Sequence, residues 1–388
     1  MFMRLHSNGA RVALGLLVGL LLPAIFWSCG DGGDSNNAGT VPAATGSAGM
    51  VVHQTNLVSD QPNQATTTDP NLVNAWGIAQ GPTTAFWIAD NGQGVSTLYN
   101  GTGQPFPVDG PLVVTIPPPA GSPPDAGAAP TGTVFNSTTD FVITAGTQSG
   151  PSTFIFATED GTLSGWNRDV DPTAAILAVD NSGANAVYKG LALGSNATGN
   201  FLYATNFHAA RVEAFDKNFA PASLSGSFSD PEIPAGFAPF GIANIGNSLY
   251  VTYAKQDDQM HDDAAGAGNG FVDIFDTNGV FVRRFASQGT LNSPWGVVRT
   301  PSGFGTLGNL ILVGDFGDGH INAFDPSSGK FLGQLSDGHS PIAIDGLWGL
   351  IFGNGGNAGD ANTLFFTAGP DMEMHGLFGM LQPGTTSM

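Results

Sequence analysis

A short phrase, a glycine followed by an apolar run, recurs along this chain at nearly constant spacing. The glycines stand at positions 77, 132, 190, 241, 296 and 349, so successive copies lie 55, 58, 51, 55 and 53 residues apart. Self-similarity at such a period is typical of repeat architectures, in which each unit buries its faces against its neighbours. The residue before each glycine is aromatic or polar: Trp76, Thr131, Lys189, Phe240, Trp295 and Trp348.

Each repeat continues with further strand-like segments. In the fourth repeat, for example, the runs Leu249–Thr252, Val272–Asp276 and Val280–Phe285 follow the glycine. Their alternation of apolar and polar residues indicates half-buried strands. Four short strands per unit of 50-odd residues are typical of a propeller blade. The sequence therefore predicts an all-β protein: a six-bladed β-propeller over residues 50–383, with four antiparallel strands per blade and a short tail at 384–388.

The sixth repeat lacks an outer strand, because only three strand-like runs follow Gly349 before the chain ends. A spare strand-like run, Val51–Val58, precedes the first repeat. We predict that this N-terminal strand pairs with residues 374–381 and completes the last blade, which removes an open sheet edge.

The first 49 residues have a different composition. Residues 1–28 read as a signal peptide, with Arg4 and Arg11 before a 15-residue apolar run, Val12–Phe26; such a run is short for a membrane span. Cys29, the only cysteine, resembles the lipid acceptor of a bacterial lipoprotein, although ordinary cleavage is the alternative. Residues 29–49 are predicted to be a flexible tether. We therefore expect an extracytoplasmic protein, held at the cell envelope by the Cys29 lipid or otherwise secreted.

The net charge of the chain limits the kinds of partner that it can bind. The chain has 31 acidic and 11 basic residues, a formal net charge of −20. The resulting field repels phosphates, so a nucleic-acid partner is not expected. Contact with a membrane is expected only through the lipid, and the propeller itself is expected to be a monomer.

Three segments carry a family resemblance. They are Trp76–Ala79, the stretch from Lys255 through His261 to Asp273, and Ser293–Val297. The glycine phrase and the strands that end in Phe-Asp are similar to NHL-type propeller repeats. The three segments more closely resemble an uncharacterised family of exported bacterial propellers, some of which carry PEP-CTERM sorting signals. The resemblance spans about residues 50–383 and implies the fold but no settled activity.

Candidate site residues gather on one predicted face. Antiparallel strands place the loop that enters each blade and the loop between its second and third strands on the same side. Polar residues concentrate in these loops, at Asn74, Asp90, Glu159, Asn185, Asn206, Asn292, Asp315 and Asp345. An insertion at 255–269 adds Asp257, Asp258, His261, Asp262 and Asp263. Long loops on rigid scaffolds often carry function, but this one also fits a mobile solvated loop, and Asn and Asp are ordinary turn residues.

Two functions fit this pattern. The first is a non-catalytic module that binds a glycan, peptide or protein through the polar face. The alternative is a metal-dependent hydrolase of lactones or esters, since six-bladed sugar lactonases hold a divalent cation in a similar arrangement. In that case Ca²⁺ or Mg²⁺ would be held by Glu159, Asn185, Asn292 and Asp345. His261 is a possible base or ligand. The sequence identifies no catalytic residue.

Overall fold

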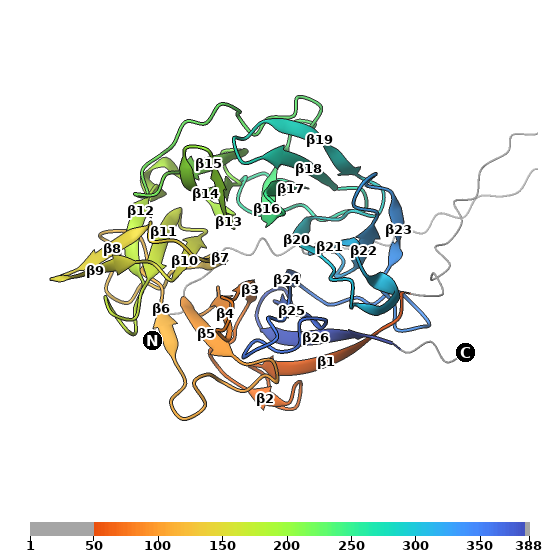
Figure 1. Cartoon of the computed structure of the whole chain (residues 1–388), viewed down its shortest axis with the longest axis horizontal. Coiled ribbons are helices and arrows are strands. Elements are labelled where there is room, and N and C mark those ends of the chain that lie inside the picture. Colours follow the sequence, from red (N-terminus) through yellow and green to blue (C-terminus); the bar gives the residue numbers. More distant parts are fainter. Residues whose placement is uncertain (1–49, 385–388) are drawn as a thin grey trace, which may run out of the picture. The chain divides into compact units, whose positions relative to one another are not determined.

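The computed structural model describes residues 50–384, and the expectations for the signal peptide, Cys29, the tether and the tail lie outside them. Six β-sheets stand around a common axis, with the first strand of each innermost (Figure 1). The six-bladed propeller is therefore confirmed. Among the described residues, no helix is long and apolar enough to span a membrane.

The blades follow one another along the chain. Blade 1 holds β3 (Ala75–Ala79), β4 (Phe86–Asp90), β5 (Val95–Tyr99) and β6 (Val113–Thr115). Blade 2 holds β7 (Pro130–Phe135), β10 (Phe154–Thr158), β11 (Thr162–Trp166) and β12 (Ile176–Asp180). Blade 3 holds β13 (Tyr188–Asn196), β14 (Gly199–Asn206) and β15 (Arg211–Phe215). Blade 4 holds β16 (Phe237–Ile245), β17 (Ser248–Lys255), β18 (Gly270–Asp276) and β19 (Phe281–Ser287).

Blade 5 holds β20 (Pro294–Arg299), β21 (Ile311–Asp315), β22 (Ile321–Phe324) and β23 (Phe331–Gln334). Blade 6 holds β24 (Leu347–Phe352), β25 (Leu364–Ala368), β26 (Leu377–Pro383), β1 (Val52–Ser59) and the short β2 (Thr67–Thr68). A hairpin of β8 (Val142–Ala145) and β9 (Gln148–Pro151) projects from the periphery of blade 2 (Figure 1).

The N-terminal strand closes the ring as predicted. Strand β1 pairs antiparallel with β26, from Val52 opposite Pro383 to Ser59 opposite Leu377. Its side chains Val52, Leu57 and Val58 are buried. The first and last strands of the propeller thus share one sheet, and the last blade has no open edge at β26.

The third blade departs from the predicted four strands, because its sheet contains three. In the outer position, Pro221 forms an isolated bridge with Phe215, and the Ala222 N–H donates to the Ala214 carbonyl at 2.8 Å. Proline has no N–H for the ladder, and further prolines follow at positions 231 and 234. The segment therefore follows the blade edge without becoming a regular strand.

The repeated glycines mark where neighbouring blades touch. A Cβ atom added to Gly241 would lie 2.1 Å from the Trp295 carbonyl oxygen of the next blade. Each of the other five glycines likewise abuts the next blade's first strand, and Gly349 closes the cycle against Trp76 and Ile78 of blade 1. Only a residue without a side chain allows this approach. The spacing of the glycines is thus the spacing of the blade contacts.

Threonines on the second strand of a blade form hydrogen bonds at the same contacts between blades. The Thr205 hydroxyl accepts the Gly190 N–H at 2.7 Å and donates to the Phe240 carbonyl at 2.7 Å. The Thr367 hydroxyl accepts the Gly349 N–H at 2.9 Å and donates to the Trp76 carbonyl. These bonds satisfy buried backbone groups at the axis and fix one blade on the next.

Candidate functional site

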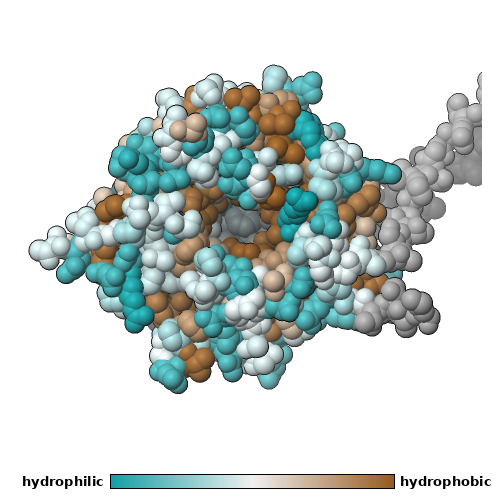
Figure 2. All heavy atoms as spheres, viewed as in Figure 1, coloured by the Kyte–Doolittle hydropathy of each residue, from teal (hydrophilic) through white to brown (hydrophobic). Residues whose placement is uncertain are grey.

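An aromatic cluster surrounds one end of the axis. Its rings come from several blades: Trp76, Phe207, Phe240, Trp295, Phe316 and Trp348. The Trp348 ring lies 3.7 Å from that of Trp76 and 3.9 Å from that of Phe316, centroid to centroid. Below it, the first strands line a central cavity of about 120 Å³. Figure 2 shows the hollow at the centre of the ring.

Asn74 fixes the two innermost tryptophans. Its Oδ1 accepts the indole N–H of Trp76 at 2.9 Å and that of Trp348 at 3.1 Å. Its backbone is left-handed (φ 47°), a conformation that asparagine tolerates better than most residues. Its amide nitrogen donates to Glu373 Oε2 at 2.7 Å. Asn74 therefore links the aromatic cluster to the charged groups above it.

A lysine lies buried among these rings. Lys189, at the second position of β13, is 1% exposed, and its Nζ lies 5.0 Å from the Trp76 ring centroid. The ammonium forms ion pairs with Glu159 and, at 3.0 Å, with Asp262. Burial alone would lower the pKa of Lys189, but the two carboxylates outweigh it and raise the pKa. Lys189 is therefore a permanent cation.

Glu373 completes the group from blade 6. It lies in the loop between β25 and β26, where Asp371, Met372 and Glu373 all adopt left-handed backbone angles (φ 57°, 54° and 66°). Each such residue costs about 1–2 kcal/mol, so the surroundings must hold the turn in place.

From blade 1, Asn91 donates to the second oxygen of Glu159 at 2.9 Å. We call Asn74, Asn91, Glu159, Lys189, Asp262 and Glu373 the mouth cluster.

Burial and the nearby Glu159 charge raise the pKa of Glu373 to about 7. The folded protein therefore retains a proton on Glu373 that the unfolded chain releases near pH 4.5. Stability tied to this proton is fully present below pH 4.5 and is lost as the pH rises through 7.

Replacing Glu373→Gln should abolish this loss, because glutamine keeps the acceptor for Asn74 without a charge. The variant should match the wild type at pH 5 and be more stable by about 1–3 kcal/mol at pH 8, at about 1.4 kcal/mol per pKa unit. Urea unfolding across this range is the measurement, with exposed Glu232→Gln as the control. A variant that is equally destabilised at every pH would contradict the assignment.

The inserted loop at 255–269 is ordered by its own hydrogen bonds. Asp257 Oδ1 accepts the backbone N–H groups of Gln259 and His261, and the Asp257 N–H donates to the Asp262 carbonyl at 2.8 Å. His261 Nδ1 lies 2.9 Å from Asp262 Oδ1, and this hydrogen bond raises the pKa of His261. Burial would raise the pKa of Asp262, but His261 and Lys189 together lower it. The loop thus brings an ionised carboxylate from blade 4 to a lysine of blade 3.

The structure brings four of the predicted site residues together: Asn74, Glu159, His261 and Asp262. Other predicted residues hold their own loops and strands. Asp90 accepts the Thr97 N–H at 2.9 Å, and Asp315 accepts from Asn322 at 2.6 Å. Asn206 donates to Glu213, and Asp257 accepts backbone N–H groups of its own loop. Asp258 is exposed, and the backbone of Asp263 forms an isolated bridge with that of Gln256.

The four residues predicted to hold a cation have separate partners. Glu159 pairs with Lys189, whereas Asp345 accepts the Asp371 N–H at 2.8 Å. The last two are Asn292, which accepts the Gly266 N–H at 2.7 Å, and Asn185, an exposed residue that ends a short 3₁₀ turn. A different set, Glu159, His261 and Asp262, places three ligand atoms within 4.8 Å of one another.

Sequence reasoning missed Lys189 and Glu373. A signal for Lys189 was present, since it occupies the position before a repeated glycine where four other repeats have an aromatic residue. Because the equivalent aromatic side chains of the other repeats gather at the axis, a lysine at that position is expected to lie among their rings. For Glu373 there was no comparable signal, because a left-handed turn without glycine leaves no sequence pattern.

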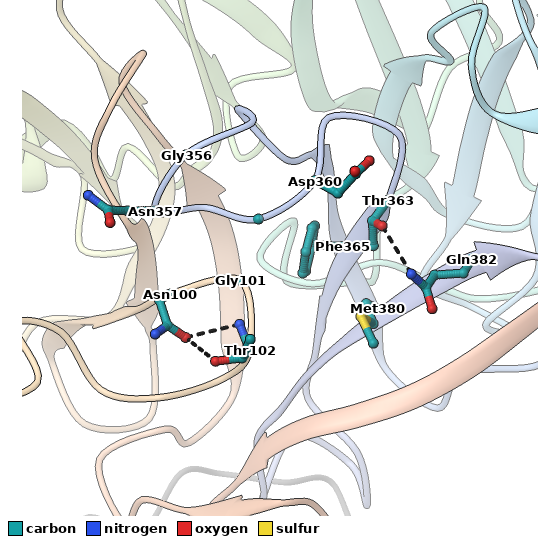
Figure 3. A pocket seen from close by; sticks show the side chains of 11 residues that line it. Asn100, Gly101, Thr102, Gly356, Asn357, Asp360, Thr363, Phe365, Met380 and Gln382 are labelled. Atoms are coloured by element: carbon teal, nitrogen blue, oxygen red, sulfur yellow. Dashed lines mark hydrogen bonds between the residues drawn. The ribbon is translucent and has the colours of Figure 1, made fainter.

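A second pocket lies between blades 6 and 1, with a volume of about 400 Å³ (Figure 3). It is built on the loop after β5 and the loop between β24 and β25, which belong to the face opposite the mouth cluster. Its floor includes Phe365 and Met380, and Gln382 donates to Thr363 at 3.4 Å. Among the described residues, Asp360 is its one carboxylate, and no cationic side chain lines it.

Comparison with known proteins gives relatives but no activity. A scan against protein-family models finds no match. The uncharacterized protein R648 of Acanthamoeba polyphaga mimivirus is 36% identical over 333 residues, which are 84% of this chain and 78% of R648. The uncharacterized protein L690 of the same virus is 32% identical over 333 residues, 84% of each chain. Among solved structures, a streptogramin B lyase is 11% identical with a TM-score of 0.44, covering 86% of this chain and 97% of the lyase.

Proposed function

This chain belongs to one family with the mimivirus proteins R648 and L690, and we propose that it is a non-catalytic binding module whose ligand site is the mouth cluster. One observation carries the proposal: five of the six blades each contribute a polar or charged residue to one connected network around the axis. Buried ion pairs seldom stabilise a fold more than apolar packing would. The network is therefore better explained by recognition than by stability.

The protonation states favour binding over catalysis. Lys189 is held protonated by Glu159 and Asp262, so it lacks the free electron pair that a nucleophile or general base needs. Glu159 is engaged on one oxygen by Lys189 and on the other by Asn91. Glu159, Lys189 and Asn91 are thus a fixed pattern of donors and acceptors, suited to hold a ligand in one orientation, whereas Glu373, with a pKa of about 7, changes charge near neutral pH.

A metal-dependent hydrolase is the second candidate, because Glu159, His261 and Asp262 offer three close ligand atoms. Ca²⁺ or Mg²⁺ would bind through the carboxylate oxygens of Glu159 and Asp262, while the third ligand atom is a ring nitrogen of His261. The Lys189 ammonium, however, already pairs with both carboxylates and would repel a second cation. Glu159 and Asp262 are therefore better explained as partners of the Lys189 ammonium than as ligands of a metal ion.

The proposal also covers where the protein is located in the cell. The apolar segment before Cys29 supports export, with the lipid on Cys29 as the anchor at the cell envelope. Mass spectrometry of the membrane fraction should find a lipid-modified N-terminal Cys29, and a free N-terminus at Gly30 or later would contradict this part of the proposal.

The binding proposal is tested with the full chain on a glycan array and a random peptide library, alongside Asp262→Asn. The Asp262 side chain is 65% exposed, asparagine keeps its shape and one oxygen acceptor, and Glu159 still pairs with Lys189, so the variant should fold; urea unfolding measures how much stability the lost charge costs. Ligands should bind the wild type at least tenfold more tightly than the variant. Asp360→Asn in the opposite pocket is the control and should bind as the wild type does.

Ligands that bind both proteins equally would contradict a site at the mouth cluster. Ca²⁺- or Mg²⁺-dependent hydrolysis of a lactone, lost in Asp262→Asn, would instead establish the second candidate.

A further inference from the structure

Exposed methionines flank the mouth cluster. Among the described residues, eight large apolar side chains are exposed, and three of them are Met260 (43%), Met372 (78%) and Met374 (53%). Met260 lies two residues before Asp262, and the other two lie on either side of Glu373. We call these three side chains the methionine rim. Exposed apolar side chains that gather in one patch beside polar groups are typical of interaction sites.

Hydrogen bonds hold the two loops that carry the rim. The Met260 N–H donates to the Asp257 carbonyl at 3.1 Å, and the Met374 N–H donates to that of Asp371 at 3.3 Å. Asp345 accepts the Asp371 N–H, and His375 bonds Asp60 at 2.8 Å. The methionines therefore stand exposed on fixed loops. Methionine is unbranched and polarizable, and it adapts to varied partner side chains.

The surroundings of the rim are acidic. Four exposed carboxylates lie on the loops at this face, against one exposed lysine, Lys255, at the start of the inserted loop; the carboxylates are Asp258, Asp262, Asp345 and Asp371. The cation at the centre, Lys189, is buried and already paired. A partner with positive charge would be attracted to this face and oriented by it.

The aromatic groups argue against a sugar in this position. Stacking on a sugar ring needs an open aromatic face, but Trp76 and Trp348 are each 1% exposed and their indole N–H groups both bond Asn74. Trp295 and Phe316 are only partly exposed, and one face of Phe316 is already stacked on Trp348. The large apolar side chains that are exposed beside the cluster are those of the three methionines, and their thioether and methylene groups suit the side chains of a polypeptide.

We propose that the methionine rim docks a polypeptide that presents a lysine or arginine flanked by apolar residues. The apolar residues contact Met260, Met372 and Met374, and the basic group points to the exposed carboxylates of Asp345 and Asp371, which lie side by side. This inference rests on the proposed binding function and names its ligand class.

The test uses three immobilised peptides: Leu-Leu-Lys-Leu-Leu, the same peptide with Glu in the centre, and Ser-Ser-Lys-Ser-Ser. The full chain should bind the first at least tenfold more tightly than either of the others. Met372→Ser with Met374→Ser should reduce binding of the first peptide about tenfold. The control is Val142→Ser on the peripheral β8–β9 hairpin, where an equally exposed apolar side chain (51%) is removed, and it should bind as the wild type does.

Equal binding of the Lys and Glu peptides would overturn the charge requirement, and equal binding of the Leu and Ser peptides would overturn the role of the rim. If glycans bind in an Asp262-dependent manner while all three peptides fail, this inference is wrong and the proposed function stands. If every ligand that is found binds the Asp262→Asn variant and the wild type with equal affinity, both this inference and the proposed function are wrong.

Discussion

Removing residues 1–62 should prevent folding, or leave a protein at least about 5 kcal/mol less stable. Strand β1 pairs with β26 at seven register positions and buries Val52, Leu57 and Val58. Burial of each such side chain contributes about 1.5–3 kcal/mol, and the deletion also exposes the β26 edge. Leu57 lies against the Gly103 turn of blade 1, so the seam between the last and first blades loses support as well.

A chain that begins at Met50 is the matched control, because it keeps every described strand. Urea unfolding followed by circular dichroism compares the two chains. Equal midpoints would show that the ring does not depend on β1.

Gly241→Ala should cost about 3 kcal/mol or more. The new Cβ would lie 2.1 Å from the Trp295 carbonyl oxygen and 3.0 Å from the Thr252 hydroxyl. Overpacking a core usually costs about 1–3 kcal/mol, and here the obstacle is the backbone of the next blade's first strand. Two blades must separate to admit one methyl group.

Gly183→Ala is the matched change, because no atom lies within 4 Å of its Cβ position. This variant should stay within about 0.5 kcal/mol of the wild type. Both free energies of unfolding come from urea titration. A loss of less than 1 kcal/mol for Gly241→Ala would show that the blade contact is loose.

The blade contacts explain why the fold was predictable. Glycine at position 241 or 296 is required by backbone approach, so the pattern survives in every repeat. The closing strand was predictable from a count of strands, and β1 pairs one residue later than predicted, at Val52–Ser59. The missing fourth strand of blade 3 was not predicted, because the prolines that prevent it lie in a segment without strand periodicity.

The site was predictable only in part. Strand order alone places the loops of Asn74, Glu159 and Asp262 on one face, and the structure brings these three residues close together. The partners of these residues were not predictable, because Lys189 meets Asp262 across 73 residues of sequence. Such a contact depends on how blades 3 and 4 pack and on the path of the inserted loop.

The most direct test of a ligand site at the mouth cluster is methionine oxidation measured by mass spectrometry, with and without bound Leu-Leu-Lys-Leu-Leu. Met380 lines the pocket on the opposite face and serves as the internal reference. We predict that the peptide slows oxidation of Met260, Met372 and Met374 at least threefold and leaves Met380 unchanged. Unchanged rates at the methionine rim, or protection of Met380 instead, would contradict binding of this peptide at the mouth cluster.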